Sequence, residues 1–150
     1  MRIENKINES IKDSMKNKDK IRLDSLRAIK SSILLEKTKS KSKAEIDEKI
    51  VIKILQKLVK QRNESAKIYY TQNRPELADV EILQAKIISE FLPDQLSEPE
   101  LSKIIDEVIK KTQSKSMKDM GRVINEVNNE VSGRAEGSLI AKIIKDRLST

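Results

Sequence analysis

Apolar residues recur every three or four positions along nearly the whole chain, and this spacing constrains the fold more than any other feature. Residues at these intervals share one face of an α-helix, because each residue turns the helix by about 100°. Only three glycines and three prolines punctuate the 150 residues. With two Tyr, one Phe and no Trp, any core must be built from aliphatic side chains. The sequence therefore predicts an all-α fold.

The first 92 residues predict an N-terminal domain of about four helices. The second helix is expected from an N-cap at Asp19 to about Thr38, and the third from about Ala44 to Thr71. Ser42 and Glu45 form a possible capping box for the third helix, and a proline opens the fourth. The expected core stripes of the four helices are Ile3, Ile7, Ile11 and Met15; Leu23, Leu26, Ile29 and Ile33; Val51, Leu55, Leu58, Ala66 and Tyr69; and Leu77, Val80, Leu83, Ile87 and Phe91.

Residues 93–150 predict a small C-terminal domain of three helices. Pro93 and Pro99 interrupt the helical pattern and place the domain boundary near residues 92–97. Ser97 with Glu100 has the spacing of a capping box, in which each side chain accepts a backbone N–H of the other residue. A second box of this kind, Ser116 with Asp119, is expected at the start of the sixth helix.

A glycine-containing hinge at residues 131–138 joins the last two predicted helices. Gly133 follows the last apolar residue of the sixth helix, where a left-handed residue commonly closes the final turn. Gly137 opens the last helix and leaves its first N–H groups accessible. With Arg134 and Lys142, these N–H groups form a candidate anion site. The alternative is that both glycines serve only the geometry of the turn.

The positive charge of the chain is concentrated in one region. The net charge is +7, and residues 16–43 carry ten Lys or Arg against three acidic residues, whereas the remaining segments balance to zero. Residues 39–43 alternate Lys and Ser, which indicates a loop. On the second helix, the candidate nucleic-acid-binding residues Lys20, Arg27, Lys30 and Lys37 project largely away from the apolar stripe. The alternative is a solvated face that only keeps the protein soluble.

Several classes of site are excluded by the residues that the chain lacks. With no Cys and no His, it has no thiol chemistry and no residues for a zinc site, and we expect neither a metal nor a cofactor. No glycine-rich loop precedes a Lys-Ser or Lys-Thr pair, so no phosphate-cradling loop is expected. No run approaches the ~20 apolar residues that span a bilayer. The expectation is a cytoplasmic protein without a membrane partner.

Four short segments carry the motifs of one known family. They are residues 15–27 (MKNKDKIRLDSLR), 90–97 (EFLPDQLS), 120–124 (MGRVI) and 133–139 (GRAEGSL). Their order and spacing resemble the YqeY family, which is related to the tail domain of GatB, a subunit of the glutamine-dependent aspartyl/glutamyl-tRNA amidotransferase. The first resembles the family's second-helix opening, the second its interdomain pattern YLP-x-QLS, and the last two the part shared with GatB tails, G-x-V-M and G-K-A-[DN]. The chain departs from that pattern at Ile124 and at Glu136, a weaker helix cap than Asp or Asn.

The resemblance implies a helical N-terminal domain, a three-helix C-terminal domain and a role in tRNA handling. Expected partners are therefore tRNA or a tRNA amidotransferase or synthetase. The family label of glutamine-dependent carbon–nitrogen ligase is inherited from GatB, and the residues do not support catalysis by this chain alone, since no activated Ser or Cys nucleophile is indicated. We assign no catalytic residue. The alternative function is a protein-interaction adaptor whose C-terminal domain docks a partner and which has no nucleic-acid role.

Overall fold

The computed structural model describes residues 2–40 and 46–149, and in these ranges all regular structure is helical. The predicted all-α class is therefore confirmed. The chain divides into two compact units, Met1–Leu92 and Pro93–Thr150. Each unit has its own cluster of buried aliphatic residues, as expected for helices that each carry one apolar face.

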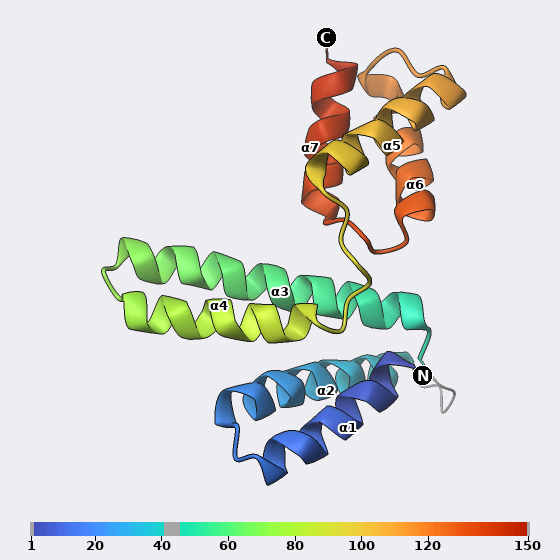
Figure 1. Cartoon of the computed structure of the whole chain (residues 1–150). Coiled ribbons are helices and arrows are strands. Elements are labelled where there is room, and N and C mark those ends of the chain that lie inside the picture. Colours follow the sequence, from blue (N-terminus) through green and yellow to red (C-terminus); the bar gives the residue numbers. More distant parts are fainter. Residues whose placement is uncertain (1, 41–45, 150) are drawn as a thin grey trace. The chain divides into compact units, whose positions relative to one another are not determined.

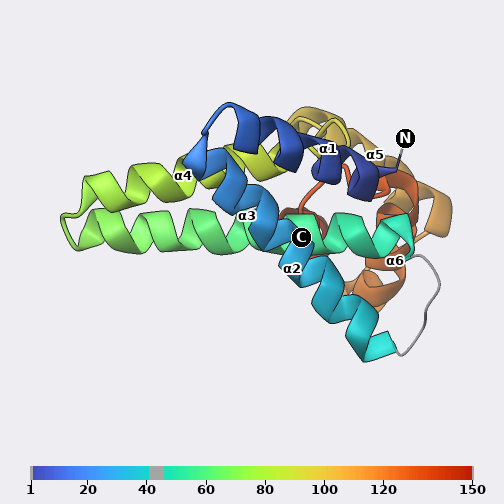
Figure 2. The same cartoon turned by 90° about the horizontal axis from the view of Figure 1, so that it is seen from below.

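The N-terminal unit consists of two helical hairpins packed as two layers (Figures 1 and 2). One hairpin is formed by α1 (Ile3–Lys16) and α2 (Lys20–Ser40), and the other by α3 (Glu48–Thr71) and α4 (Pro75–Ser89). In both views the first hairpin crosses the second near one end, so the other end of the α3–α4 pair extends beyond it. α3 and α4 pack side by side along their lengths.

Sequence rules account for most of the helix boundaries in this unit. Asp19 is the expected cap of α2, since its Oδ1 accepts the N–H of Arg22 at 3.1 Å. Pro75 occupies the first turn of α4, where its missing N–H costs no hydrogen bond. Leu26, Ile29 and Leu55 are fully buried at the contact between the two layers.

Two predicted boundaries are wrong. α3 begins at Glu48 instead of Ala44, because Asp47 caps the helix by accepting the N–H of Lys49 at 3.0 Å. The proposed capping box of Ser42 and Glu45 lies outside the described residues. α2 extends to Ser40, so Lys39 and Ser40 are helical and do not begin the predicted loop, whose residues 41–43 lie outside the described ranges.

The buried face of α4 also differs from the predicted stripe. Val80 and Leu83 are 38% and 42% exposed, whereas Ala78, Ala85 and Ile88 are buried. The small alanine side chains let α4 lie close to α3. Val80 and Leu83 share a face with the buried Ile87 but remain exposed, and Ile88, on a neighbouring face, is the α4 residue that joins the core cluster with α1 and α2. Met15, at the end of the predicted stripe of α1, is similarly exposed.

The C-terminal unit is formed by α5 (Glu98–Thr112), a short 3₁₀ turn η1 (Met117–Asp119), α6 (Met120–Val131) and α7 (Gly137–Leu148). Its core is entirely aliphatic, and the fully buried residues come from all three α-helices: Leu101, Ile105, Val123, Val127 and Ile144. The capping box of Ser97 and Glu100 is confirmed, with the Glu100 carboxylate accepting the Ser97 N–H at 3.1 Å. The Asp119 carboxylate likewise accepts the N–H of Ser116 at 3.4 Å.

We expect acid to destabilise the C-terminal unit through these two carboxylates. Hydrogen bonds from Ser97 lower the pKa of Glu100 below its usual 4.5. The backbone N–H of Lys115 lowers the pKa of Asp119 below its usual 3.8. Because the folded pKa lies below the unfolded pKa, the stabilisation is complete above the unfolded value and is lost as the pH falls through the folded one.

This expectation is checked by following hydrogen exchange of α5 and α6 in the full chain between pH 5 and about pH 3, the range set by carboxyl pKa values near or below 4.5. The double variant Glu100→Gln, Asp119→Asn should begin less stable and change less with pH than the parent. An identical pH profile for parent and variant would contradict the assignment.

Candidate nucleic-acid interface

Three of the predicted cations lie together on the exposed face of α2. Lys20, Arg27 and Lys30 are exposed, whereas Leu26 and Ile29 of the same helix are fully buried. In the described parts of the chain, none of the three cations forms an ion pair with a carboxylate. They therefore present positive charge to solvent at intervals of seven and three residues, about two turns and one turn of the helix.

The fourth predicted cation of this helix has a different environment. Lys37 is half-buried, and its Nζ lies 2.5 Å from Oε1 of Glu4 in α1. Arg22 similarly pairs with Glu90, with Nη1 at 2.6 Å from Oε2. These two ion pairs hold α2 against its neighbours, so part of the charge counted in residues 16–43 is compensated within the unit.

The hinge between α6 and α7 has the predicted left-handed glycine. Gly133 has φ 82°, and the preceding Ser132 is also left-handed, with φ 45°. The N–H of Leu96 donates to the Arg134 carbonyl at 2.8 Å, and Nε2 of Gln95 donates to the Gly133 carbonyl at 3.1 Å. Hydrogen bonds thus hold the segment after Leu92 against the hinge. The position of this segment therefore depends on the left-handed conformation of Gly133.

The candidate anion site at this hinge has both supporting and opposing features. Arg134 and Lys142 are exposed, but Nε of Arg134 already donates to the carbonyl of Asp94 at 3.1 Å. Gly137 is the first residue of α7, as predicted. Oε1 of Glu136 accepts the Ser138 hydroxyl at 2.6 Å, which keeps a negative charge beside the first turn of α7. This carboxylate opposes a phosphate at the N–H groups of that turn.

A row of exposed lysines on α3 was missed from the sequence. Lys49, Lys53, Lys57, Lys60 and Lys67 are all exposed and recur at intervals of three, four or seven residues. The signal was hidden because the acidic residues of α4 and its flanks bring residues 44–92 to zero net charge. Assigning the charges helix by helix would have revealed it, since α3 carries six Lys or Arg against two Glu.

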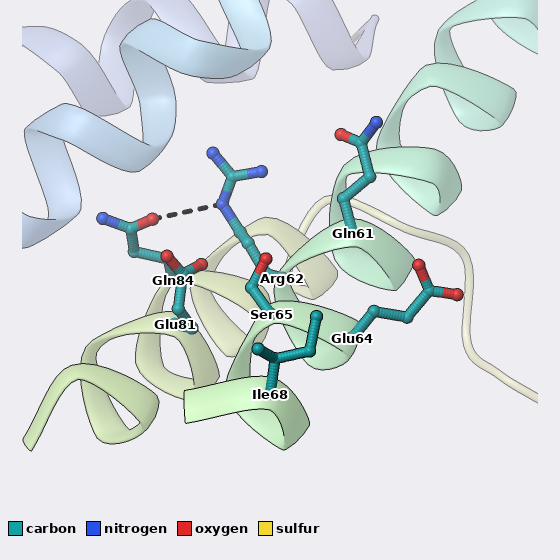
Figure 3. Close-up of a pocket in the computed structure, with 7 residues that line it drawn as sticks. All are labelled: Gln61, Arg62, Glu64, Ser65, Ile68, Glu81 and Gln84. Carbon is teal, nitrogen blue, oxygen red and sulfur yellow. Dashed lines mark hydrogen bonds between the residues drawn. The ribbon is translucent and has the colours of Figure 1, made fainter. Parts of the chain in front are cut away.

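A shallow hollow lies beside α3 and α4 and contains one arginine (Figure 3). Nε of Arg62 donates to Oε1 of Gln84 at 3.1 Å, and Nη1 donates to the Leu58 carbonyl at 3.2 Å. Arg62 therefore ties α4 to α3. Ser65 contributes a hydroxyl to the hollow, but no base is hydrogen-bonded to it in the described structure, so no activated nucleophile is formed there.

The described residues provide neither a metal-binding cluster nor a membrane-spanning helix. No group of three or more Asp, Glu, His or Cys side chains is arranged to hold a metal ion within residues 2–40 and 46–149. In the same ranges, no helix has both the length and the apolar character needed to cross a lipid bilayer.

Comparison with known families gives a match over both units. A family model described as Yqey-like protein matches residues 4–148. The chain belongs to the YqeY family. The match confirms the resemblance that was based on the segments at residues 15–27, 90–97 and 120–139. No curated protein matches the sequence. This YqeY-family chain has three candidate sites: the exposed cations of α2, the exposed lysines of α3 and the hinge between α6 and α7.

Proposed function

We propose that this YqeY-family protein is an accessory factor that binds RNA, most simply tRNA, and presents it to a tRNA-handling enzyme such as a tRNA-dependent amidotransferase. The observation that carries the proposal is the surplus of exposed cations without ion-pair partners on the N-terminal unit, in the part of the chain that the structure describes. Such cations release counterions when they neutralise phosphates, and this release drives binding. The family's relation to the GatB tail supports tRNA as the RNA.

The protein is proposed to act without a catalytic step of its own. Glutamine amide hydrolysis requires an activated nucleophile and donors that stabilise the oxyanion. In the described part of the chain, the buried serine hydroxyls are those of Ser14 in α1, Ser25 in α2 and Ser114 just after α5, and none of them lines the hollow beside α3 and α4. Oγ of Ser25 donates to the Ile21 carbonyl at 2.9 Å and Oγ of Ser114 is paired with Thr112, so both have structural roles.

The N-terminal unit is favoured over the hinge as the RNA-binding part. Lys20, Arg27 and Lys30 have no carboxylate partner in the described residues, whereas Arg134 is engaged with the Asp94 carbonyl and lies two residues from Glu136. Arg134 and Lys142 are proposed as secondary phosphate contacts. Recognition would depend on charge and shape, because Tyr70, the most exposed ring, donates its hydroxyl to Asp79 at 2.8 Å and links α3 to α4.

We expect the full-length protein to bind fluorescently labelled, unfractionated tRNA with an affinity that decreases steeply as salt is added. Each neutralised phosphate contributes about 0.7–0.9 to the slope of log affinity against log salt concentration, so contact with several phosphates gives a slope of about −3 or steeper. Anisotropy titrations between 50 and 200 mM salt, the range over which such slopes are resolved, measure it. Failure to bind tRNA at 50 mM salt, or binding that is independent of salt, would contradict the proposal.

A protein-interaction adaptor is the second candidate function. It is favoured by apolar side chains exposed on α3 and α4, where Ile68, Ile82 and Leu83 are 55%, 41% and 42% exposed. A partner that covered these residues would bind mainly by apolar burial, which responds weakly to salt. The same salt titration therefore separates the two candidates: an adaptor would retain its protein partner at a salt concentration that releases RNA.

A further inference from the structure

The lysines of α3 form one continuous row on the surface of the N-terminal unit. Lys49, Lys53, Lys57, Lys60 and Lys67 fall within about 80° of one another around the helix, and they span about 27 Å along its axis. The buried residues Val51, Leu55 and Leu58 are on the opposite side. The row, which we call the α3 lysine row, therefore faces away from the core of its unit.

The charges of this row are not compensated by the protein. Within residues 2–40 and 46–149, none of the five amines forms an ion pair, and Glu64 is the single acidic residue on the same face of α3. Lysines three and four residues apart repel each other, so the row opposes the stability of the helix that carries it. An arrangement that is unfavourable for the isolated protein becomes favourable when a polyanion neutralises it.

The basic face of α2 is less suited to an extended polyanion. Lys37 and Arg22 are paired with Glu4 and Glu90, and the exposed end of the helix also presents Leu34 and Leu35, which are 63% and 59% exposed. Of the four other cations of the helix, Lys39 lies off the face of Lys20, Arg27 and Lys30, and those three are spread over half of the helix. The α3 lysine row, by contrast, is a straight series along one 24-residue helix.

We infer that the α3 lysine row is the principal surface on which the protein holds an RNA backbone, an inference that rests on the RNA-binding function proposed above. Lysine ammonium groups act as hydrated point charges that attract phosphates without reading bases. At about 100° per residue, Tyr69 and Tyr70 fall outside the arc of the helix that the lysines occupy. The inferred contact therefore involves no stacking of bases on these rings. Lysines four residues apart are about 6 Å apart along the axis, which allows each to contact a separate phosphate.

The test compares two full-length variants that lose the same number of positive charges. Lys53, Lys57 and Lys60 are replaced by Gln in one variant, and Lys20, Arg27 and Lys30 are replaced by Gln in the other. The α3 variant is expected to bind labelled tRNA about tenfold or more weakly at low salt, with a salt slope reduced by about 2, as for the loss of three phosphate contacts. The α2 variant should show a smaller loss of tRNA affinity and a smaller reduction of the salt slope.

A third variant, with Lys53, Lys57 and Lys60 replaced by Arg, keeps the charge and should bind like the parent. All six positions are exposed, so circular dichroism should show the helical content of the parent in every variant. If the parent binds tRNA and the α3 Gln variant binds equally well, or if the α2 variant loses more affinity, the inference is wrong while the proposed function stands. It is also wrong if the Arg variant fails to restore binding.

A lipid surface is the other polyanion that a lysine row could contact. Binding to a membrane interface generally requires apolar side chains that insert between the lipids, and the row itself contains none. Vesicles containing phosphatidylglycerol serve as the probe. Binding of the parent to these vesicles without any binding to tRNA would overturn both the inference and the proposed function.

Discussion

Replacing Ile105 with alanine is expected to destabilise the C-terminal unit by about 2–5 kcal/mol and to leave it largely unfolded. Ile105 is fully buried in α5, in a core supplied by α5, α6 and α7. The substitution removes apolar contacts and leaves a cavity that rigid neighbouring helices fill only in part. A unit confined to Pro93–Thr150 has little stability in reserve, since domains of this size rarely gain more than about 3–5 kcal/mol from a single core.

Hydrogen exchange of the full-length variant tests this expectation in each unit separately. Amides of α5, α6 and α7 should lose protection, while those of α3 keep the protection of the parent, because Leu55 and Leu58 belong to a different core cluster. Met117→Ala is the matched control in the same unit: its side chain is 44% exposed, so the change should be below about 1 kcal/mol. Parent-like protection of α5 in the Ile105 variant would contradict the prediction.

The helices of this protein could be predicted because local signals agree with one another along the chain. The apolar spacing of α5, its Ser97–Glu100 cap and Pro99 in its first turn all favour a helix in the same place. At the start of α3 the signals compete. Ser and Asp are both common N-cap residues, so the sequence offers Ser42 and Asp47 as alternatives. The helix begins after Asp47, and the apolar spacing alone does not distinguish the two positions.

Burial was harder to predict than helix position. The spacing of Val80, Leu83 and Ile87 correctly identifies residues that share a face of α4, but it does not show whether another helix covers that face. Of the three, Ile87 alone is buried, and it is Ile88, on a neighbouring face of α4, that joins the core cluster shared with the first hairpin. The contact between the two layers is a tertiary feature, and local spacing contains no information about how far it extends.

Charge was predicted for one candidate surface and missed for another. The net charge of residues 16–43 identified α2 as a basic helix, and Lys20, Arg27 and Lys30 are exposed on it. It did not show that Lys37 is paired with Glu4, since that contact joins residues of different helices. Summing over residues 44–92 cancelled the lysines of α3 against acidic residues elsewhere. Charge must therefore be assigned to individual helix faces before a surface can be recognised.

The largest effect on the hinge is expected from Gly133→Val, which should destabilise the C-terminal unit by about 1–3 kcal/mol. Gly133 has φ 82°, and a β-branched residue is strongly disfavoured at such a positive angle. The Gly133 carbonyl accepts a hydrogen bond from Gln95, and the next residue accepts one from Leu96. A turn forced to a negative φ would misplace both carbonyls, so the segment after Leu92 should lose protection together with the ends of α6 and α7.

Two control variants distinguish backbone strain from other effects of adding a side chain. Gly133→Asn should be milder than Gly133→Val, because asparagine tolerates the left-handed region. Gly137→Ala should be neutral or slightly stabilising: a Cβ there meets no atom within 4 Å, and alanine favours the helix that begins at this residue. Hydrogen exchange of α6 and α7 in the full-length variants gives the ranking. Equal destabilisation by Gly133→Val and Gly133→Asn would contradict the prediction. The left-handed conformation of Gly133 would then not be what holds residues 94–96 against the turn between α6 and α7.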